Sequence, residues 1–115
     1  MSPVRGRSGP RSEPDRGRPL EVCYIDWHVT PFRADRWYEI WSAGAARAMA
    51  FGAKGWSLTR SIDDPLLFRQ SSVWENRADF DRYWYSDEVA SIREQAVNYY
   101  AKPLNPSWHE LVAGE

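Results

Sequence analysis

The chain has 115 residues and a formal net charge of −1, a length that allows one domain and no more. Residues 1–19 hold four Pro, three Gly and five Arg but only Met1 and Val4 as apolar side chains, so we expect a disordered tail there. The domain is then predicted over residues 20–115. The tail carries five Arg against Glu13 and Asp15 (+3), and the remainder carries ten basic and fourteen acidic residues (−4). A mildly acidic body argues against a nucleic-acid partner.

The chain lacks the patterns of membrane and secreted proteins. No apolar run approaches the length of a transmembrane helix, and no apolar stretch follows the N-terminal Arg residues as it does in a secretory signal. The single Cys23 cannot form an internal disulfide, so we expect a cytoplasmic protein. Two His and one Cys also argue against a structural zinc site.

The aromatic content points to a cavity or an interface. Seven Trp, six Tyr and four Phe all fall after residue 19. Each buries a large area, and a body of this size has a limited interior. We therefore expect many of them to lie in a subunit interface, to line a cavity, or both.

The first predicted elements are a strand and a helix. Residues 20–29 (LEVCYIDWHV) are typical of a strand, and their alternation gives one wholly apolar face and one aromatic and polar face. The apolar face comprises Cys23, Ile25, Trp27 and Val29. The other comprises Val22, Tyr24, Asp26 and His28. Thr30-Pro31 is predicted to begin a helix whose apolar steps of three and four run over residues 33–51.

A hairpin, a helix pair and a last strand follow. Residues 56–62 and 66–74 predict antiparallel strands joined by the Asp63-Asp64-Pro65 turn. Asn76 and Ser86 are predicted N-caps of two helices, the second extending to Lys102-Pro103. Residues 107–112 (SWHELV) predict the final strand.

This order predicts an α+β, ferredoxin-like βαββαβ fold with a split second helix and a four-stranded antiparallel sheet. Helices on one face would leave the other sheet face bare. We expect that bare face to include Ile25, Trp27 and Val73, and to be covered in a homodimer, since large apolar faces are not left in water.

The stretch Phe68 to Ser86 (FRQSSVWENRADFDRYWYS) and the preceding DDP turn resemble the dimeric α/β-barrel superfamily, in particular its antibiotic-biosynthesis-monooxygenase-like domains. The resemblance covers roughly residues 20–112. The segment from Val97 to Leu111 is also similar to the small polyketide cyclases of that superfamily. Members include monooxygenases without a cofactor, heme-degrading enzymes and proteins without known chemistry, so function is argued from the residues of the site.

The resemblance implies a ligand between the sheet and the helices of each subunit. The predicted cavity face comprises Tyr24, Asp26, His28, Gln70, Ser72 and Trp74, with Tyr83 and Trp84 above it. The heme-ligating His of the heme-degrading members falls near Arg93, and their strand-one Asn falls near Asp26, so heme degradation is disfavoured. The oxygenase branch uses Asn, Trp and Tyr around its substrate, and Asn76, Trp74 and Tyr83 offer those residue types.

Each candidate also has a structural alternative. Asp26 and His28 are the predicted catalytic residues: either could remove a phenol proton, and Asp26 could instead orient His28. The structural alternative is that His28 is partly exposed near the strand end and Asp26 pairs with an Arg such as Arg60 or Arg69. Trp74 is predicted either to stack on a flat ligand or to be an ordinary core residue. Arg93 is predicted either to bind an anionic ligand or to lie in solvent beside Glu94.

Four further residues complete the set of candidates. Tyr24 and Gln70 are predicted cavity walls. His109 is taken as structural or exposed, since one His without fellow ligands is not a metal site. Cys23 is expected to be a buried, inert thiol.

The predicted function is a monooxygenase-like enzyme that acts on a small aromatic or polyketide-type compound without a flavin or metal, as the resemblance implies. The alternatives are a polyketide cyclase of the same fold and a non-catalytic ligand-binding dimer. Oxygen consumption separates the first two. A Soret band that appears when heme is titrated into the protein would instead indicate heme binding.

Overall fold

The computed structural model describes residues 19–114, so the tail predicted for residues 1–19 lies, apart from Pro19, outside the described residues. Its elements, in chain order, are β1 (Glu21–His28), α1 (Ala34–Ala46), the 3₁₀ helix η1 (Arg47–Phe51), β2 (Gly55–Arg60), β3 (Leu67–Trp74), α2 (Arg77–Trp84), α3 (Asp87–Gln95), the 3₁₀ helix η2 (Val97–Tyr99) and β4 (Ser107–Glu110). This order confirms the predicted βαββαβ arrangement with a split second helix.

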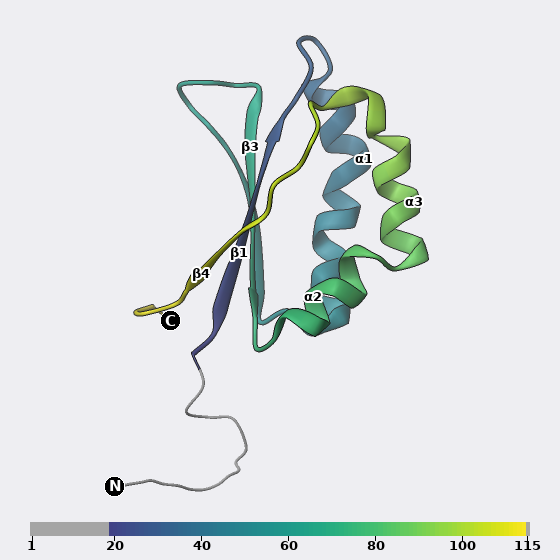
Figure 1. The fold of residues 1–115 in the computed structure, drawn as a ribbon. Coiled ribbons are helices and arrows are strands. Elements are labelled where there is room, and N and C mark those ends of the chain that lie inside the picture. The colour runs from purple at the N-terminus through teal and green to yellow at the C-terminus, as the bar shows by residue number, and fades with distance from the viewer. Residues whose placement is uncertain (1–18, 115) are drawn as a thin grey trace, which may run out of the picture.

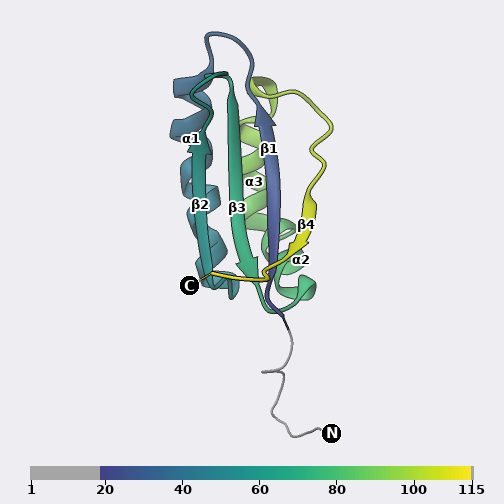
Figure 2. The same ribbon diagram turned by 90° about the vertical axis from the view of Figure 1, so that its left-hand side faces the viewer.

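The four strands form one antiparallel sheet in the order β2-β3-β1-β4 (Figure 2). The helices of residues 19–114 all cover the same face of that sheet, and none of them lies over the opposite face (Figure 1). The C-terminal residues lie on the side of the sheet away from the helices (Figure 1). The molecule therefore has two layers, as expected of a ferredoxin-like α+β domain.

Local capping explains where the two short helices begin. The side-chain oxygen Oδ1 of Asn76 accepts from the backbone N–H of Asp79 at 3.0 Å, and the Ser86 hydroxyl accepts from that of Val89 at 3.2 Å. Each cap satisfies one backbone donor that the first helical turn leaves free. Both predicted N-caps are thus confirmed.

Four predicted boundaries differ from the structure by two residues or more. One is the end of the last strand, which lies at Glu110 rather than at residue 112. The first helix begins at Ala34 rather than at Thr30-Pro31, because Phe32 adopts a positive φ of 67° that interrupts helical geometry. Ile62 lies beyond the end of β2 and is 96% exposed. The last α-helix ends at Gln95, and the chain continues as the 3₁₀ turn η2 instead of reaching Lys102 as a helix.

The inner face of the sheet, which packs against the helices, carries the apolar residues of β1. Ile25 and Trp27 are 1% and 0% exposed and belong to the core. Our prediction that these two residues lie on the bare face was therefore wrong; of the three residues named for it, only Val73 lies there, opposite Val22. The helices cover the face whose burial removes the most apolar area from water.

We call the uncovered side of the sheet the outer face; its residues alternate with those of the core. In β1 it includes Tyr24, Asp26 and His28, and β3 contributes their direct partners. Those partners in β3 are Ser71, Arg69 and Leu67.

Candidate functional site

The space between sheet and helices is occupied by the chain's own aromatic side chains. Trp27, Trp37, Trp41, Trp74 and Tyr83 are all fully buried there. Burial of this kind stabilises the fold but leaves no room for a ligand at the centre of the layer. A ligand site on the helix side of the sheet must therefore lie at an edge of the core.

The centre of the core is held by a polar network around Gln70. The Oε1 atom of Gln70 accepts from the indole N–H groups of Trp27 and Trp41 at 3.1 and 2.8 Å. Its Nε2 donates to the Tyr83 hydroxyl at 3.1 Å, and that hydroxyl donates to the Gly44 carbonyl at 2.8 Å. Every polar group of this network finds a partner, so Gln70 and Tyr83 act first as structural residues.

Trp74 and Asn76 also make contacts within the fold. The indole N–H of Trp74 donates to the Ser72 hydroxyl at 2.8 Å, and its ring packs edge-on against Phe80. Asn76 is the N-cap of α2 described above. Neither residue lines the pocket described below.

Asp26, His28 and Tyr24 lie on the outer face, away from these residues. In the antiparallel register Asp26 is opposite Arg69, while Gln70 is opposite Ile25. Our prediction that Tyr24, Asp26 and His28 share one cavity face with Gln70 and Trp74 was therefore wrong. Periodicity separated the two faces of each strand correctly, but the pairing of faces between strands depends on register.

On the outer face, Asp26 forms the ion pair that was the alternative to a catalytic role. Arg69 donates through Nε and Nη2 to the two carboxylate oxygens of Asp26 at 2.8 and 3.1 Å. These hydrogen bonds lower the pKa of Asp26 below its ordinary value, against a smaller opposing effect of burial. The Arg69 guanidinium also lies 5.1 Å from the centroid of the Tyr24 ring.

A pocket of about 520 Å³ opens at the edge of the core, between α2, α3 and the segment that leads into β4. We call it the Trp84 pocket. It is lined by aromatic and cationic side chains and by short stretches of the final segment. These residues are Arg77, Phe80, Asp81, Trp84, Tyr85, Arg93, Tyr100, Lys102, Leu104, Pro106 and Trp108.

The aromatic residues of the Trp84 pocket form a row. Phe80 stacks on Trp84 with ring centroids 5.8 Å apart, and on its other side meets Trp108 edge-on at 5.2 Å. Trp27 connects Trp84 to Tyr100 through centroid distances of 6.2 and 4.9 Å. The row thus runs from Trp108 through Phe80 and Trp84 to Tyr100.

Each of three cations lies over a ring of this row. Arg77 lies 4.7 Å from the Trp108 centroid, Arg93 lies 4.3 Å from that of Trp84, and Lys102 lies 4.7 Å from that of Tyr100. The negative face of each ring attracts the cation and keeps it beside the pocket wall. Flat surfaces and fixed positive charges together suit an aromatic ligand that carries or develops negative charge.

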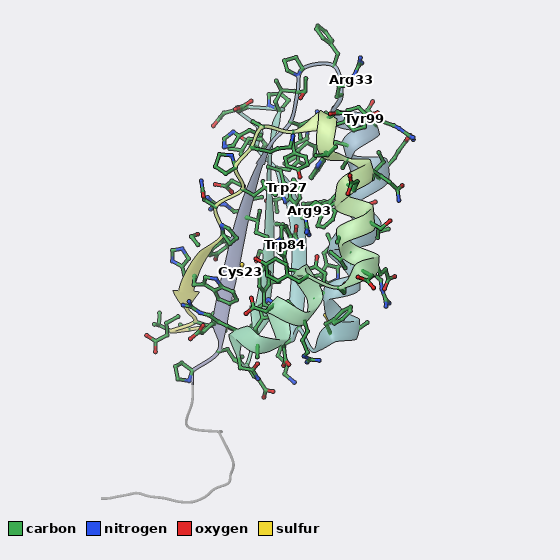
Figure 3. The ribbon with its side chains drawn as sticks, turned by 45° about the vertical axis from the view of Figure 1, so that its right-hand side comes forward. Cys23, Trp27, Arg33, Trp84, Arg93 and Tyr99 are labelled. Atoms are coloured by element: carbon green, nitrogen blue, oxygen red, sulfur yellow. The ribbon has the colours of Figure 1, made fainter. Side chains whose placement is uncertain are left out.

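Arg93 is the central cation and is half-buried. Its Nη1 donates to the Trp84 carbonyl oxygen at 2.9 Å, which fixes the guanidinium between the sheet and α3 (Figure 3). Burial raises the pKa of Tyr100 and of Tyr83, and in both cases the charge of Arg93 opposes that rise. The field of Arg93 therefore already favours the anionic form of phenols close to it.

Sequence reasoning identified Arg93 but missed Arg77, Tyr100, Lys102 and Trp108 as members of the same pocket. The residues are separated in the chain and carry no motif. Tyr100 and Trp108 belong to the stretch that resembles the small polyketide cyclases, which was the one signal available. Tyr100 and Trp108 come close to α2 only because the final segment folds back along the sheet.

Cys23 is fully buried on the inner face of β1, as the sequence indicated. Burial raises the pKa of its thiol to about 12, with a smaller opposing effect from Arg77. A thiol held in the protonated form is a poor nucleophile. Cys23 is thus a core residue.

Over residues 19–114 the structure contains no group of three or more His, Cys, Asp or Glu side chains suited to hold a metal ion. Within the same range no helix has the length and apolarity needed to cross a membrane.

The sheet order and the single helix layer define the class of fold, and several solved structures with this fold are provisionally named antibiotic biosynthesis monooxygenases. The chain superposes with a TM-score of 0.73 on a protein from Nitrosomonas europaea provisionally named an antibiotic biosynthesis monooxygenase, at 15% identity over 79% of this chain and 88% of the other. A similarly named protein from Caulobacter crescentus gives 0.73 at 14% identity, over 84% and 92% of the two chains. A third, from Chloroflexus aurantiacus, gives 0.70 at 16% identity, over 84% and 96%.

At these identities the likeness shows the fold that the chain shares with monooxygenase-like proteins of this type. No protein-family model matches the sequence, and no curated protein is significantly similar to it. The resemblance noted from the sequence is therefore confirmed at the level of the fold.

Proposed function

We propose that the protein is a monooxygenase-like enzyme that oxidises a small aromatic compound in the Trp84 pocket without a bound flavin or metal. The observation that carries this proposal is the position of Arg93, half-buried and 4.3 Å from the centroid of Trp84 in a pocket of about 520 Å³. The fold shared with proteins named as monooxygenases supports the same class. Polyketide-type rings such as anthrones are one group of compounds with the required chemistry.

The proposed reaction starts with loss of a proton from the substrate. Asp81 is the acceptor, because it is the one carboxylate among the described residues that line the pocket. The guanidinium of Arg93 stabilises the phenolate or enolate that forms. The electron-rich anion then reduces O₂ directly, which removes the need for an external reductant.

For an anthrone the reaction is balanced by the substrate and O₂ alone. The methylene carbon loses both hydrogens and gains one oxygen atom as a carbonyl, and the second oxygen atom leaves as water. The substrate supplies all four electrons. Trp84 and Phe80 hold the flat ring beside Arg93 during these steps, which keeps the reacting carbon in one orientation.

The test is oxygen uptake by the full-length chain with an anthrone and with a hydroquinone, accompanied by product analysis. The proposal expects consumption of one O₂ per quinone formed and dependence of the rate on Arg93. Cyclised product from an open-chain poly-ketone, without oxygen uptake by any of the substrates, would replace the proposal with the polyketide cyclase. Binding of the aromatic compounds without turnover would replace it with the non-catalytic ligand-binding protein.

The non-catalytic alternative has a specific observation in its favour. Asp26 and His28, which the sequence suggested as the catalytic pair, lie across the sheet from the Trp84 pocket, and Asp26 is engaged by Arg69. A pocket with cations and rings but a single carboxylate is well suited to binding alone. Catalysis by Asp26 or His28 would need a different site, on the outer face.

We further propose that the outer face forms the contact of a homodimer. No helix of the described residues covers this face (Figure 1), and it contains Tyr24, Leu67 and Val73 beside the Asp26–Arg69 pair. Two such faces packed about a two-fold axis would cover the apolar side chains of both copies.

A further inference from the structure

We propose that the ligand of the Trp84 pocket is a planar aromatic acid whose carboxylate binds the ammonium group of Lys102 at the Tyr100 end of the pocket. This inference rests on the proposed use of the pocket for aromatic compounds and adds the chemical class of the ligand. It assigns Lys102 as a residue that determines specificity, distinct from Arg93 at the reacting end.

Lys102 is held in place before any ligand arrives. Its Nζ donates to the carbonyl oxygen of Val97 and, at 3.3 Å, to that of Tyr100, and it lies 4.7 Å from the Tyr100 ring centroid. An ammonium group has three N–H donors, so two carbonyls leave one donor for a ligand. A single remaining donor with one positive charge suits a monoanion such as a carboxylate.

The balance of charge in the pocket also favours an acid. Arg77, Arg93 and Lys102 face one carboxylate, that of Asp81. Arg77 is partly neutralised from outside the pocket by Glu21, whose Oε1 lies 3.1 Å from its Nε. Within residues 19–114 neither Arg93 nor Lys102 forms an ion pair with a carboxylate.

The charge of Arg93, which lies over Trp84, also reaches the Tyr100 end of the aromatic row. Lys102 lies over the Tyr100 ring, and the charge of Arg93 opposes the rise in the pKa of the Tyr100 phenol that burial causes. Two positive charges close to one ring, neither of them ion-paired within residues 19–114, attract an anion more strongly than either alone. The rings of Trp84 and Phe80 then receive the flat part of the same ligand.

The experiment compares two probes that share a ring system and differ in charge, 2-naphthoate and 2-naphthamide. Both are titrated into the full-length chain by calorimetry. We expect naphthoate to bind about tenfold more tightly than naphthamide, and added salt to weaken only the naphthoate. Lys102→Met should remove this preference and leave the naphthamide affinity within about twofold, since the apolar stem of the side chain is retained.

The chain offers a matched control in its only other lysine. Lys54 pairs with Glu75 at 3.6 Å and does not line the pocket. Lys54→Met should therefore leave both affinities unchanged, and Lys102→Arg should keep the preference for the acid. Thermal melting of each variant verifies that it is folded.

The results that would contradict the Lys102 inference can be told apart from those that would contradict the proposed function. Equal binding of naphthoate and naphthamide would overturn the inference while the proposed aromatic pocket stands. An equal loss of affinity in the Lys54 and Lys102 variants would overturn it as well, since it would indicate a general effect of charge. Absence of binding by either probe would overturn both proposals. A preference for the acid without oxygen uptake by any aromatic substrate would support the inference and overturn the enzymatic proposal.

Discussion

Arg93 contacts Trp84 in two ways, by a cation–π interaction with the indole ring and by a hydrogen bond to the backbone carbonyl. The guanidinium lies 4.3 Å from the indole centroid, and its Nη1 donates to the carbonyl oxygen of Trp84 at 2.9 Å. Two attachments to one residue hold the charge at a fixed position in the pocket wall. A fixed charge stabilises a developing anion more effectively than one that must first reorient.

Replacing Arg93 by Met tests this role. We expect the rate of oxygen uptake to fall on the order of 100-fold, because loss of one preorganised donor to an oxyanion has an effect of that size. The measurement is kcat with an anthrone substrate. Arg36→Met is the control, since Arg36 is exposed on α1 and pairs with Glu39; an equal loss in that variant would contradict a specific role for Arg93.

Gln70→Leu should strongly destabilise the protein. The leucine cannot accept from the indole groups of Trp27 and Trp41 or donate to Tyr83, and buried polar groups without partners cost about 1–3 kcal/mol each. We expect the free energy of unfolding in urea to fall by about 3 kcal/mol or more. The exposed Gln95→Leu on α3 should change it by less than about 0.5 kcal/mol. Equal stabilities of the two variants would show that the network contributes little.

Gly44→Ala tests the close approach of α1 to the core. A Cβ at this position would lie 2.6 Å from Cζ3 of Trp41, whose ring is fully buried and cannot withdraw. Overpacking costs about 1–3 kcal/mol, which exceeds the gain of about 1 kcal/mol that Ala brings to a helix. We expect a net loss of about 1–2 kcal/mol in thermal or urea unfolding.

Gly55→Ala is the matched control for that substitution. A Cβ there meets no heavy atom within 4 Å in the described part of the chain. The stability of the Gly55→Ala variant should stay the same or rise slightly, since Ala loses less backbone entropy on folding than Gly does. Destabilisation of both variants to the same extent would rule out the Trp41 contact as the cause.

Asp26→Asn separates the structural role of Asp26 from the catalytic one suggested by the sequence. The hydrogen bonds from Arg69 lower the pKa of Asp26, so its contribution to stability is present above the ordinary value of 3.8 and is lost as the pH falls through the lowered pKa. Since the pair is partly exposed, we expect the variant to be about 0.2–1 kcal/mol less stable at pH 7. That difference should vanish as the pH is lowered from about 5 to about 2.

Oxygen uptake provides the second measurement on this variant. Turnover should be unchanged, because Asp26 lies across the sheet from the Trp84 pocket. The exposed Asp63→Asn controls for loss of a negative charge elsewhere. Loss of turnover in Asp26→Asn without loss of stability would restore the sequence-based assignment of Asp26 to catalysis.

Ser71→Arg tests the proposed dimer. Ser71 lies on the outer face opposite Tyr24, and a long charged side chain at this position would block face-to-face packing of two sheets. We expect the native chain to sediment at twice its 13.4 kDa and the variant at the monomer mass. Ser91→Arg, exposed on α3 in the other layer, should remain dimeric. A native chain that sediments as a monomer would contradict the proposal.

The sequence determined the order of the elements and most of the caps. The alternation in residues 20–29, the helical steps over 33–51 and the caps at Asn76 and Ser86 are local patterns, and local hydrogen bonds and side-chain periodicity decide them. The same alternation separated Ile25 and Trp27 from Tyr24 and Asp26. It could not say which of these two faces the helices would cover.

Only the tertiary structure decided that question and the composition of the pocket. The strand register brings Ile25 beside Gln70 and Asp26 beside Arg69, so the helices bury the first pair and leave the second exposed to solvent. The Trp84 pocket brings together Arg77, Arg93 and Lys102 from α2, α3 and the segment before β4. Contacts between distant segments depend on which packing buries the most apolar area at once, and that sum is a property of the whole fold rather than of any stretch of sequence.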